Sequence, residues 1–100
     1  MRLINTTNSN PELVRNQLQN TDAQLVEIYS AGNTDVIFTK APNHYELLIS
    51  NKYRAIQDDE LNAIREFFFR RKIDQSIVIP GETKTLYTDH LIEISLPTTI

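Results

Sequence analysis

The sequence contains no cysteine, no tryptophan and only two glycines in its 100 residues. The absence of cysteine excludes disulfide bonds, thiol nucleophiles and cysteine-ligated zinc or iron–sulfur sites. The two glycines, Gly32 and Gly81, stand far apart, which excludes the glycine-rich loops that hold phosphate groups. We therefore expect a protein that binds no cofactor.

Long apolar runs are also absent. No stretch approaches the roughly 20 apolar residues that span a bilayer, and the first residues lack the apolar segment of a signal peptide. A chain without cysteine suits a reducing compartment. We therefore expect a cytoplasmic protein that has no membrane partner.

Positive charge is scarce as well. Ten Lys and Arg residues face thirteen Asp and Glu residues, which gives a formal net charge of −3. This balance disfavours nucleic acid as the main partner, because binding by counterion release needs clustered basic side chains. The apolar share of 40% and the charged share of 23% are close to globular averages, so residues 1–100 should form a single domain.

Alternation of apolar and polar residues with a period of two predicts several strands. Leu3 and Ile4 predict a short first strand, and residues 24–30, 34–39 and 45–50 predict a three-stranded meander. Turn-forming residues at 31–33 and 41–43 separate the strands of this meander. Further along, a brief apolar run at 77–79 precedes a pair of strands predicted at 83–87 and 90–96.

Two segments carry the signals of helices. Asn10 followed by Pro11 favours a helix start, and this helix should run from about residue 11 to residue 20. Acidic residues at 58–60 and basic residues at 70–72 predict a second helix, because the helix dipole favours this order of charges. The resulting order is strand, helix, three strands, helix and two strands.

This order predicts an α+β fold. The simplest packing is a mostly antiparallel sheet of about five or six strands with both helices on one face. The opposite face of the sheet is then left to solvent or to a partner.

Three consecutive phenylalanines, Phe67, Phe68 and Phe69, stand out in the second predicted helix. Consecutive helical residues point about 100° apart, so one buried stripe cannot hold all three. Leu61, Ile64 and Phe68 define the buried side, which places Phe67 and Phe69 on the two flanks. Either neighbouring strands or the C-terminal tail cover these flanks, or Phe67 and Phe69 are interface residues for a second copy of the chain or another protein.

Basic residues near the phenylalanines suggest an alternative function. A nucleic acid or another phosphate-bearing ligand could be held by their charges while an aromatic ring stacks on a base. The simpler interpretation is that these charges complement the helix dipole and keep the surface solvated. The basic-patch candidates are Arg65, Arg70, Arg71 and Lys72, with Lys52 and Arg54 as an extension.

No motif identifies a catalytic site or a metal site, and we expect neither. His44 and His90 lack the local spacing that brings two imidazoles to one metal ion. A small enzyme could still assemble a site from scattered polar residues such as His44, Asp35 and Glu46, although nothing in the sequence singles them out. Glu93 has no distinctive spacing, and we interpret it as a solvated surface residue.

Several segments carry a resemblance to a known family. These are NTDA at 20–23, YSAGNTDV at 29–36, LISNK at 48–52, REFF at 65–68 and ISLPTT at 94–99. Over nearly its full length the chain resembles a family of short, functionally uncharacterised proteins of lactic-acid bacteria and their relatives, classified as a domain of unknown function. The resemblance implies a bacterial cytosolic protein and transfers no activity to any residue.

The sequence therefore predicts a noncatalytic interaction or regulatory module. We expect it to associate with itself, as a homodimer, or with another protein, through the second predicted helix or an exposed sheet edge. The alternatives are a ligand-binding basic patch on that helix and a small enzyme whose site the sequence does not reveal.

Overall fold

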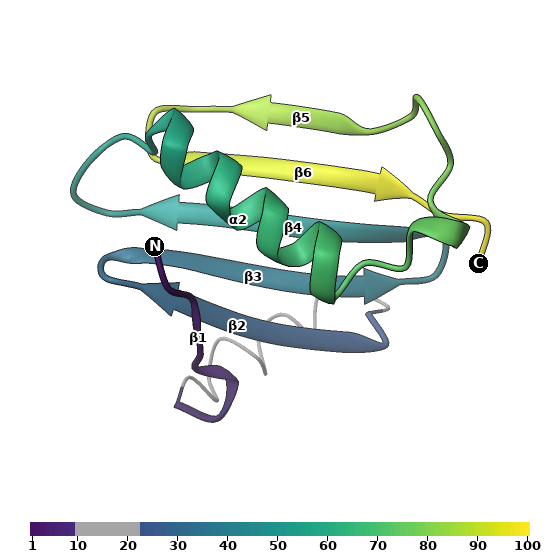
Figure 1. Cartoon of the computed structure of the whole chain (residues 1–100), viewed down its shortest axis with the longest axis horizontal. Helices are drawn as coiled ribbons and strands as arrows, with labels where there is room; N and C mark the ends of the chain where they lie inside the picture. The colour runs from purple at the N-terminus through teal and green to yellow at the C-terminus, as the bar shows by residue number, and fades with distance from the viewer. Residues whose placement is uncertain (10–22) are drawn as a thin grey trace.

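The computed structural model describes residues 1–9 and 23–100. In this part of the chain, one antiparallel sheet has the strand order β1-β2-β3-β4-β6-β5, and helix α2 lies across one face of it (Figure 1). The strands are β1 (Ile4–Asn5), β2 (Leu25–Ala31), β3 (Thr34–Ala41), β4 (His44–Asn51), β5 (Lys84–Tyr87) and β6 (Leu91–Pro97). The helix is α2 (Asp58–Arg71), and two 3-10 turns are η1 (Thr7–Ser9) and η2 (Gln75–Ile77).

The predicted α+β class and the six-stranded antiparallel sheet are confirmed. Of the two helices predicted on one face, the described residues confirm α2. The other predicted helix, at about 11–20, lies outside the described residues. The apolar run at 77–79 begins at the last residue of η2 and makes one isolated bridge, between Val78 and Thr98.

Two tight turns connect the strands of the meander. Ala31 pairs with Thr34 across the first turn, where Gly32 adopts a positive φ of 61°. Ala41 pairs with His44 across the second turn, where Asn43 has a φ of 72°. Glycine and asparagine are the residues that enter this left-handed region at lowest cost, and that preference fixes the register of both hairpins.

Helix α2 begins and ends as its charges predict. The side chain of Glu60 accepts a hydrogen bond from the backbone N–H of Gln57, as in a capping box. At the other end the backbone N–H groups of Lys72 and Ile73 both donate to the carbonyl of Phe68, which closes the last turn. No helix in the described part of the chain is long and apolar enough to cross a bilayer.

The hydrophobic core lies between α2 and the sheet. Alternate residues of β2, β3, β4 and β6 point toward the helix, as the period of two requires. The helix contributes Leu61, Ile64 and Phe68. The sheet and the segment after the helix contribute Tyr29, Val36, Phe38, Tyr45, Leu47, Ile49, Ile73, Ile92, Ile94 and Leu96.

The chain does not add its last strands in sequence order. After α2 the chain forms β5 at one edge of the sheet, and β6 then returns between β5 and β4 (Figure 1). Two features follow from this path. Strand β5 becomes an edge strand, and side chains of β4 and β6 become neighbours on the face opposite α2.

Candidate binding surfaces

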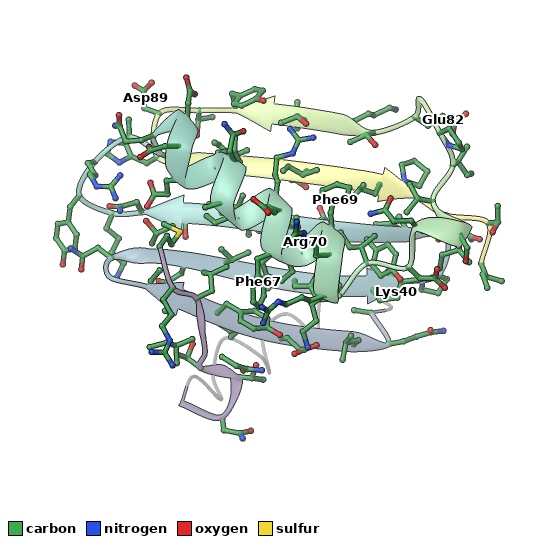
Figure 2. All side chains as sticks on the ribbon, viewed as in Figure 1. Lys40, Phe67, Phe69, Arg70, Glu82 and Asp89 are labelled. Carbon is green, nitrogen blue, oxygen red and sulfur yellow. The ribbon has the colours of Figure 1, made fainter. Side chains whose placement is uncertain are left out.

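The predicted interface residues Phe67 and Phe69 flank α2. Phe67 lies toward β2 and β3, whereas Phe69 lies toward β6 (Figure 2). Both are half-buried and pack against the core, and the ring of Phe67 meets the ring of Tyr29 edge-on with centroids 5.5 Å apart. The flanks are thus partly covered from within the chain, and a role in a protein interface stays a prediction.

The predicted basic-patch residues point in different directions around α2. The guanidinium of Arg65 lies 5.8 Å from the ring centroid of Phe69, and that of Arg71 lies 5.4 Å from the ring centroid of Phe67. Contacts of this kind are cation–π interactions. Each flank therefore carries one arginine over one phenylalanine.

The other two basic candidates have acidic partners. Arg70 pairs with Glu66 at 3.4 Å, and the ammonium of Lys72 donates to Glu27 at 3.3 Å. The pKa of Lys72 is raised, first by its hydrogen bond with Tyr29 and then by Glu27. The four cations do not share one open surface, and a role in binding phosphate stays a prediction.

Arg54, the proposed extension of the patch, instead anchors the start of α2. Its guanidinium holds both carboxylate oxygens of Glu60, at 2.8 and 2.9 Å. Thr34 donates to the same carboxylate at 2.6 Å, and Asn51 donates to Thr34 at 3.0 Å. The arginine is the main reason that the pKa of Glu60 is lowered, so this nearly buried carboxyl group is held in its ionised form.

A pair of glutamates lies on the sheet face opposite α2. Glu46 is on β4 and Glu93 is on β6, and the two are diagonal neighbours because Glu46 pairs with Ser95 and Leu48 pairs with Glu93. The pKa of Glu46 is raised to about 7, first by a hydrogen bond with Glu93, then by burial and by the charge of Glu93. At neutral pH the two carboxyl groups therefore share a proton part of the time.

A cavity opens beside the two glutamates. Its volume is about 250 Å³, and it is lined by Ile37, Thr39, Glu46, Leu48 and Glu93. The cavity thus combines two carboxyl groups and one hydroxyl group with two aliphatic walls.

Of the three polar residues considered for an enzyme site, His44 and Glu46 lie close together and Asp35 does not join them. His44 approaches Glu46, with Nε2 and Oε2 3.7 Å apart. Asp35 instead accepts a hydrogen bond of 2.6 Å from Ser30, and it does not line the cavity. Within residues 1–9 and 23–100, no group of three or more His, Cys, Asp or Glu side chains is placed to hold a metal ion.

Glu93 is the residue that the sequence analysis missed. Its side chain alternates with buried Ile92 and Ile94, so the sequence does place it on the face away from the core. What the sequence does not reveal is that β6 lies next to β4, which brings Glu93 to Glu46. If every pair of predicted strands is treated as possible neighbours, Glu46 and Glu93 are one of several pairs of outward-facing acidic residues.

Strand β5 presents a free edge. Within the described residues no strand pairs with its outer side, and Leu86 and Tyr87 are 67% and 63% exposed (Figure 1). Leu86 points away from α2, because its partner Glu93 lies on the opposite face, whereas Tyr87 points to the helix side with Ile92. Both faces of this edge therefore carry an exposed apolar side chain.

The backbone groups that point outward from β5 follow from its pairing with β6. Thr88 N–H donates to Leu91 O at 2.8 Å, so Leu91 directs its carbonyl toward the β5 side of β6. The preceding residue, His90, instead accepts from Asn51 N–H of β4 at 3.0 Å, on the other side. Hydrogen-bonded pairs alternate along antiparallel strands, so Leu86 also directs its backbone groups to β6. The N–H and C=O groups of Thr85 and Tyr87 consequently point outward.

One family model matches almost the whole chain. Residues 1–97 match the model of a domain of unknown function, DUF1827. The chain belongs to this family. The predicted resemblance to short uncharacterised proteins of lactic-acid bacteria is confirmed.

One solved structure is similar to this chain over its full length. It is described as a conserved protein of unknown function from Streptococcus thermophilus LMG 18311, at 67% identity and a TM-score of 0.96. The match covers 100% of this chain and 99% of that chain. No curated protein matches this chain. The fold of this chain is therefore also that of a solved structure, and neither relation assigns a catalytic or binding role.

Proposed function

We propose that this protein is a noncatalytic cytoplasmic interaction module that self-associates through the outer edge of β5. The observation that carries the proposal is the free backbone edge at Thr85 and Tyr87, flanked by the exposed side chains of Leu86 and Tyr87. Unpaired strand edges bind other strands readily, because each outward N–H and C=O group gains a partner. The absence of cysteine supports the cytoplasmic setting.

The edge is complementary to itself in one register. If two copies align β5 antiparallel about a two-fold axis at Leu86, Thr85 of one copy faces Tyr87 of the other. All four outward backbone groups of each strand then find a partner. The two Leu86 side chains meet on the face opposite α2, and the sheet continues through both copies.

The proposed contact between two β5 edges buries little surface, which limits the affinity of the dimer. A standard stable interface buries roughly 1,600 Å², which is more than four residues on each side supply. We therefore expect a weak dimer, with a dissociation constant of about 100 μM or weaker. A weak contact suits a reversible regulatory association.

The experiment is light scattering across a concentration series from about 10 μM to 1 mM. Leu86→Asp places two like charges at the two-fold axis, so this variant should stay monomeric where the wild type dimerises. Thr85→Pro removes one outward N–H group without touching the ladder to β6, and it should weaken the dimer as well. Thr85→Ala, which keeps that N–H group, is the matched control and should dimerise like the wild type.

Two results would refute the proposal. One is a wild type that remains monomeric up to about 1 mM. The other is a dimer that Leu86→Asp and Thr85→Pro leave intact and that Phe69→Asp dissociates while circular dichroism shows a folded chain. The second result would place the interface on the flank of α2.

A further inference from the structure

The second edge of the sheet, at β2, differs from the edge at β5. A sheet with two open edges could pair the β5 edge of one copy with the β2 edge of the next, and this head-to-tail contact does not close. The result would be a growing filament in place of a dimer. The described residues beside β2 bear on this possibility, because η1 lies beyond the outer edge of that strand (Figure 1).

The outward backbone groups of β2 are bonded by the residues of β1 and η1. Ser30 lies opposite Ile4 of β1, which covers the end of the strand. At Ile28 the carbonyl oxygen accepts from the backbone N–H of Thr6 at 2.7 Å. The N–H group of Ile28 donates at 2.8 Å to a side chain, the hydroxyl of Thr7. A hydroxyl group thus lies where a carbonyl group of a neighbouring strand would otherwise accept.

The Thr7 hydroxyl is held in this position by its own hydrogen bonds. It donates to the side-chain oxygen of Asn5 at 2.6 Å, and the same oxygen accepts from the backbone N–H of Thr7 at 3.0 Å. The amide group of Asn5 in turn donates to the carboxylate of Glu27 at 3.2 Å. A hydroxyl group has one hydrogen, so its bond to Asn5 leaves its lone pairs to accept from Ile28. A residue without a hydroxyl at position 7 cannot make this contact.

Little of the β2 edge is left open. Outward groups alternate along a strand, so the next outward position before Ile28 is Val26. Before it, the N–H group of Gln24 donates to the carbonyl of Lys40 on β3 at 2.7 Å and thus points into the sheet. Within residues 1–9 and 23–100, β2 therefore keeps at most one open outward position between its start and β1.

We infer that η1 is an edge cap that closes β2 to other strands, and that the hydroxyl of Thr7 is its blocking group. The cap is an autoinhibitory contact, because it occupies a backbone donor that another strand would bind. It restricts strand addition to the β5 edge, so self-association stops at a two-fold dimer. This consequence rests on the proposed function, whereas the cap itself closes β2 in the monomer as well.

The first test is amide hydrogen exchange by NMR in dilute protein. It compares the wild type with Thr7→Val, which keeps the shape of the side chain without the hydroxyl. The N–H group of Ile28 should exchange at least about tenfold faster in this variant. The N–H group of Tyr29 points to β3 and should keep its protection. Thr7→Ser retains the hydroxyl and is the matched control, so it should protect Ile28 like the wild type.

The second test is light scattering in the background of Leu86→Asp, which closes the β5 edge. At concentrations up to about 1 mM, Thr7→Val/Leu86→Asp should form larger species than Leu86→Asp alone, because its β2 edge is open. Thr7→Ser/Leu86→Asp should match Leu86→Asp. The β5 edge takes no part in this comparison, so a failure of the proposed function leaves the test of the cap intact.

Either of two results would overturn the inference. One is equal protection of Ile28 N–H in the wild type and in folded Thr7→Val. The other is a folded Thr7→Val/Leu86→Asp chain that is no larger than Leu86→Asp. If circular dichroism shows that Thr7→Val is unfolded, Asn5→Ala takes its place, because it removes the acceptor that orients the hydroxyl. Asn5→Ala should then speed exchange at Ile28 by a smaller factor, and unchanged exchange would equally refute the cap.

Discussion

Glu46 is the residue whose protonation depends most clearly on a neighbour. Its pKa lies near 7 because Glu93 hydrogen-bonds its protonated form and because the site is partly buried. The folded state thus holds this proton more tightly than the unfolded chain does. The associated stability is fully present below pH 4.5 and is lost as the pH rises through about 7.

Replacing Glu93 removes the charge beside Glu46, so it should also remove the loss of folding stability that occurs as the pH rises through about 7. We expect Glu93→Gln to be more stable than the wild type at pH 8, by about 1 kcal/mol, and to differ much less at pH 5. Urea denaturation at the two pH values measures the difference. Glu82→Gln is the control, because Glu82 is exposed and does not contact the pair. Equal stability of Glu93→Gln and the wild type at pH 8 would show that the two carboxyl groups do not interact.

At the scale of elements, the start of α2 is fixed to the sheet by one buried carboxylate. Glu60 is 6% exposed and receives hydrogen bonds from Arg54, in the connection between β4 and α2, and from Thr34 of β3. Arg54 itself is 50% exposed, so it stays solvated if Glu60 is replaced, and the cost lies in the hydrogen bonds that the carboxylate accepts.

We therefore expect Glu60→Gln to destabilise the fold by about 1–3 kcal/mol at pH 7. The pKa of Glu60 is lowered in the folded state, so its contribution is present above its ordinary pKa and is lost as the pH falls through the lowered value. Denaturation curves of wild type and variant should accordingly converge at acid pH. Asp58→Asn, an exposed change in the same helical turn, should cost less than about 1 kcal/mol. A loss at Glu60 no larger than that at Asp58 would contradict the anchoring role.

The elements themselves could largely be predicted from the sequence. Alternation gives β2, β3 and β4, Gly32 and Asn43 give their turns, and the charges at its ends give α2. These signals are local, so no tertiary information was needed. The other predicted helix, at about 11–20, lies outside the described residues.

The arrangement of the elements in the whole molecule could not be predicted. Nothing local in residues 84–97 says that β6 lies inside the sheet and β5 at its edge. Both candidate surfaces depend on that order, because it exposes Thr85 and Tyr87 and brings Glu93 to Glu46. The phenylalanines are a second example. Helical geometry places Phe67 and Phe69 on the flanks of α2, but which residues cover them depends on the tertiary structure.

At the scale of the whole molecule, we propose that the edge of β5 is the surface of self-association. The most direct measurement is amide hydrogen exchange by NMR at low and at high protein concentration. We predict that Leu86 N–H is protected at both concentrations, because it is directed to β6. The N–H groups of Thr85 and Tyr87 should exchange rapidly in dilute protein and slowly in concentrated protein. Rapid exchange of Thr85 and Tyr87 at every concentration, with Leu86 protected throughout, would contradict it.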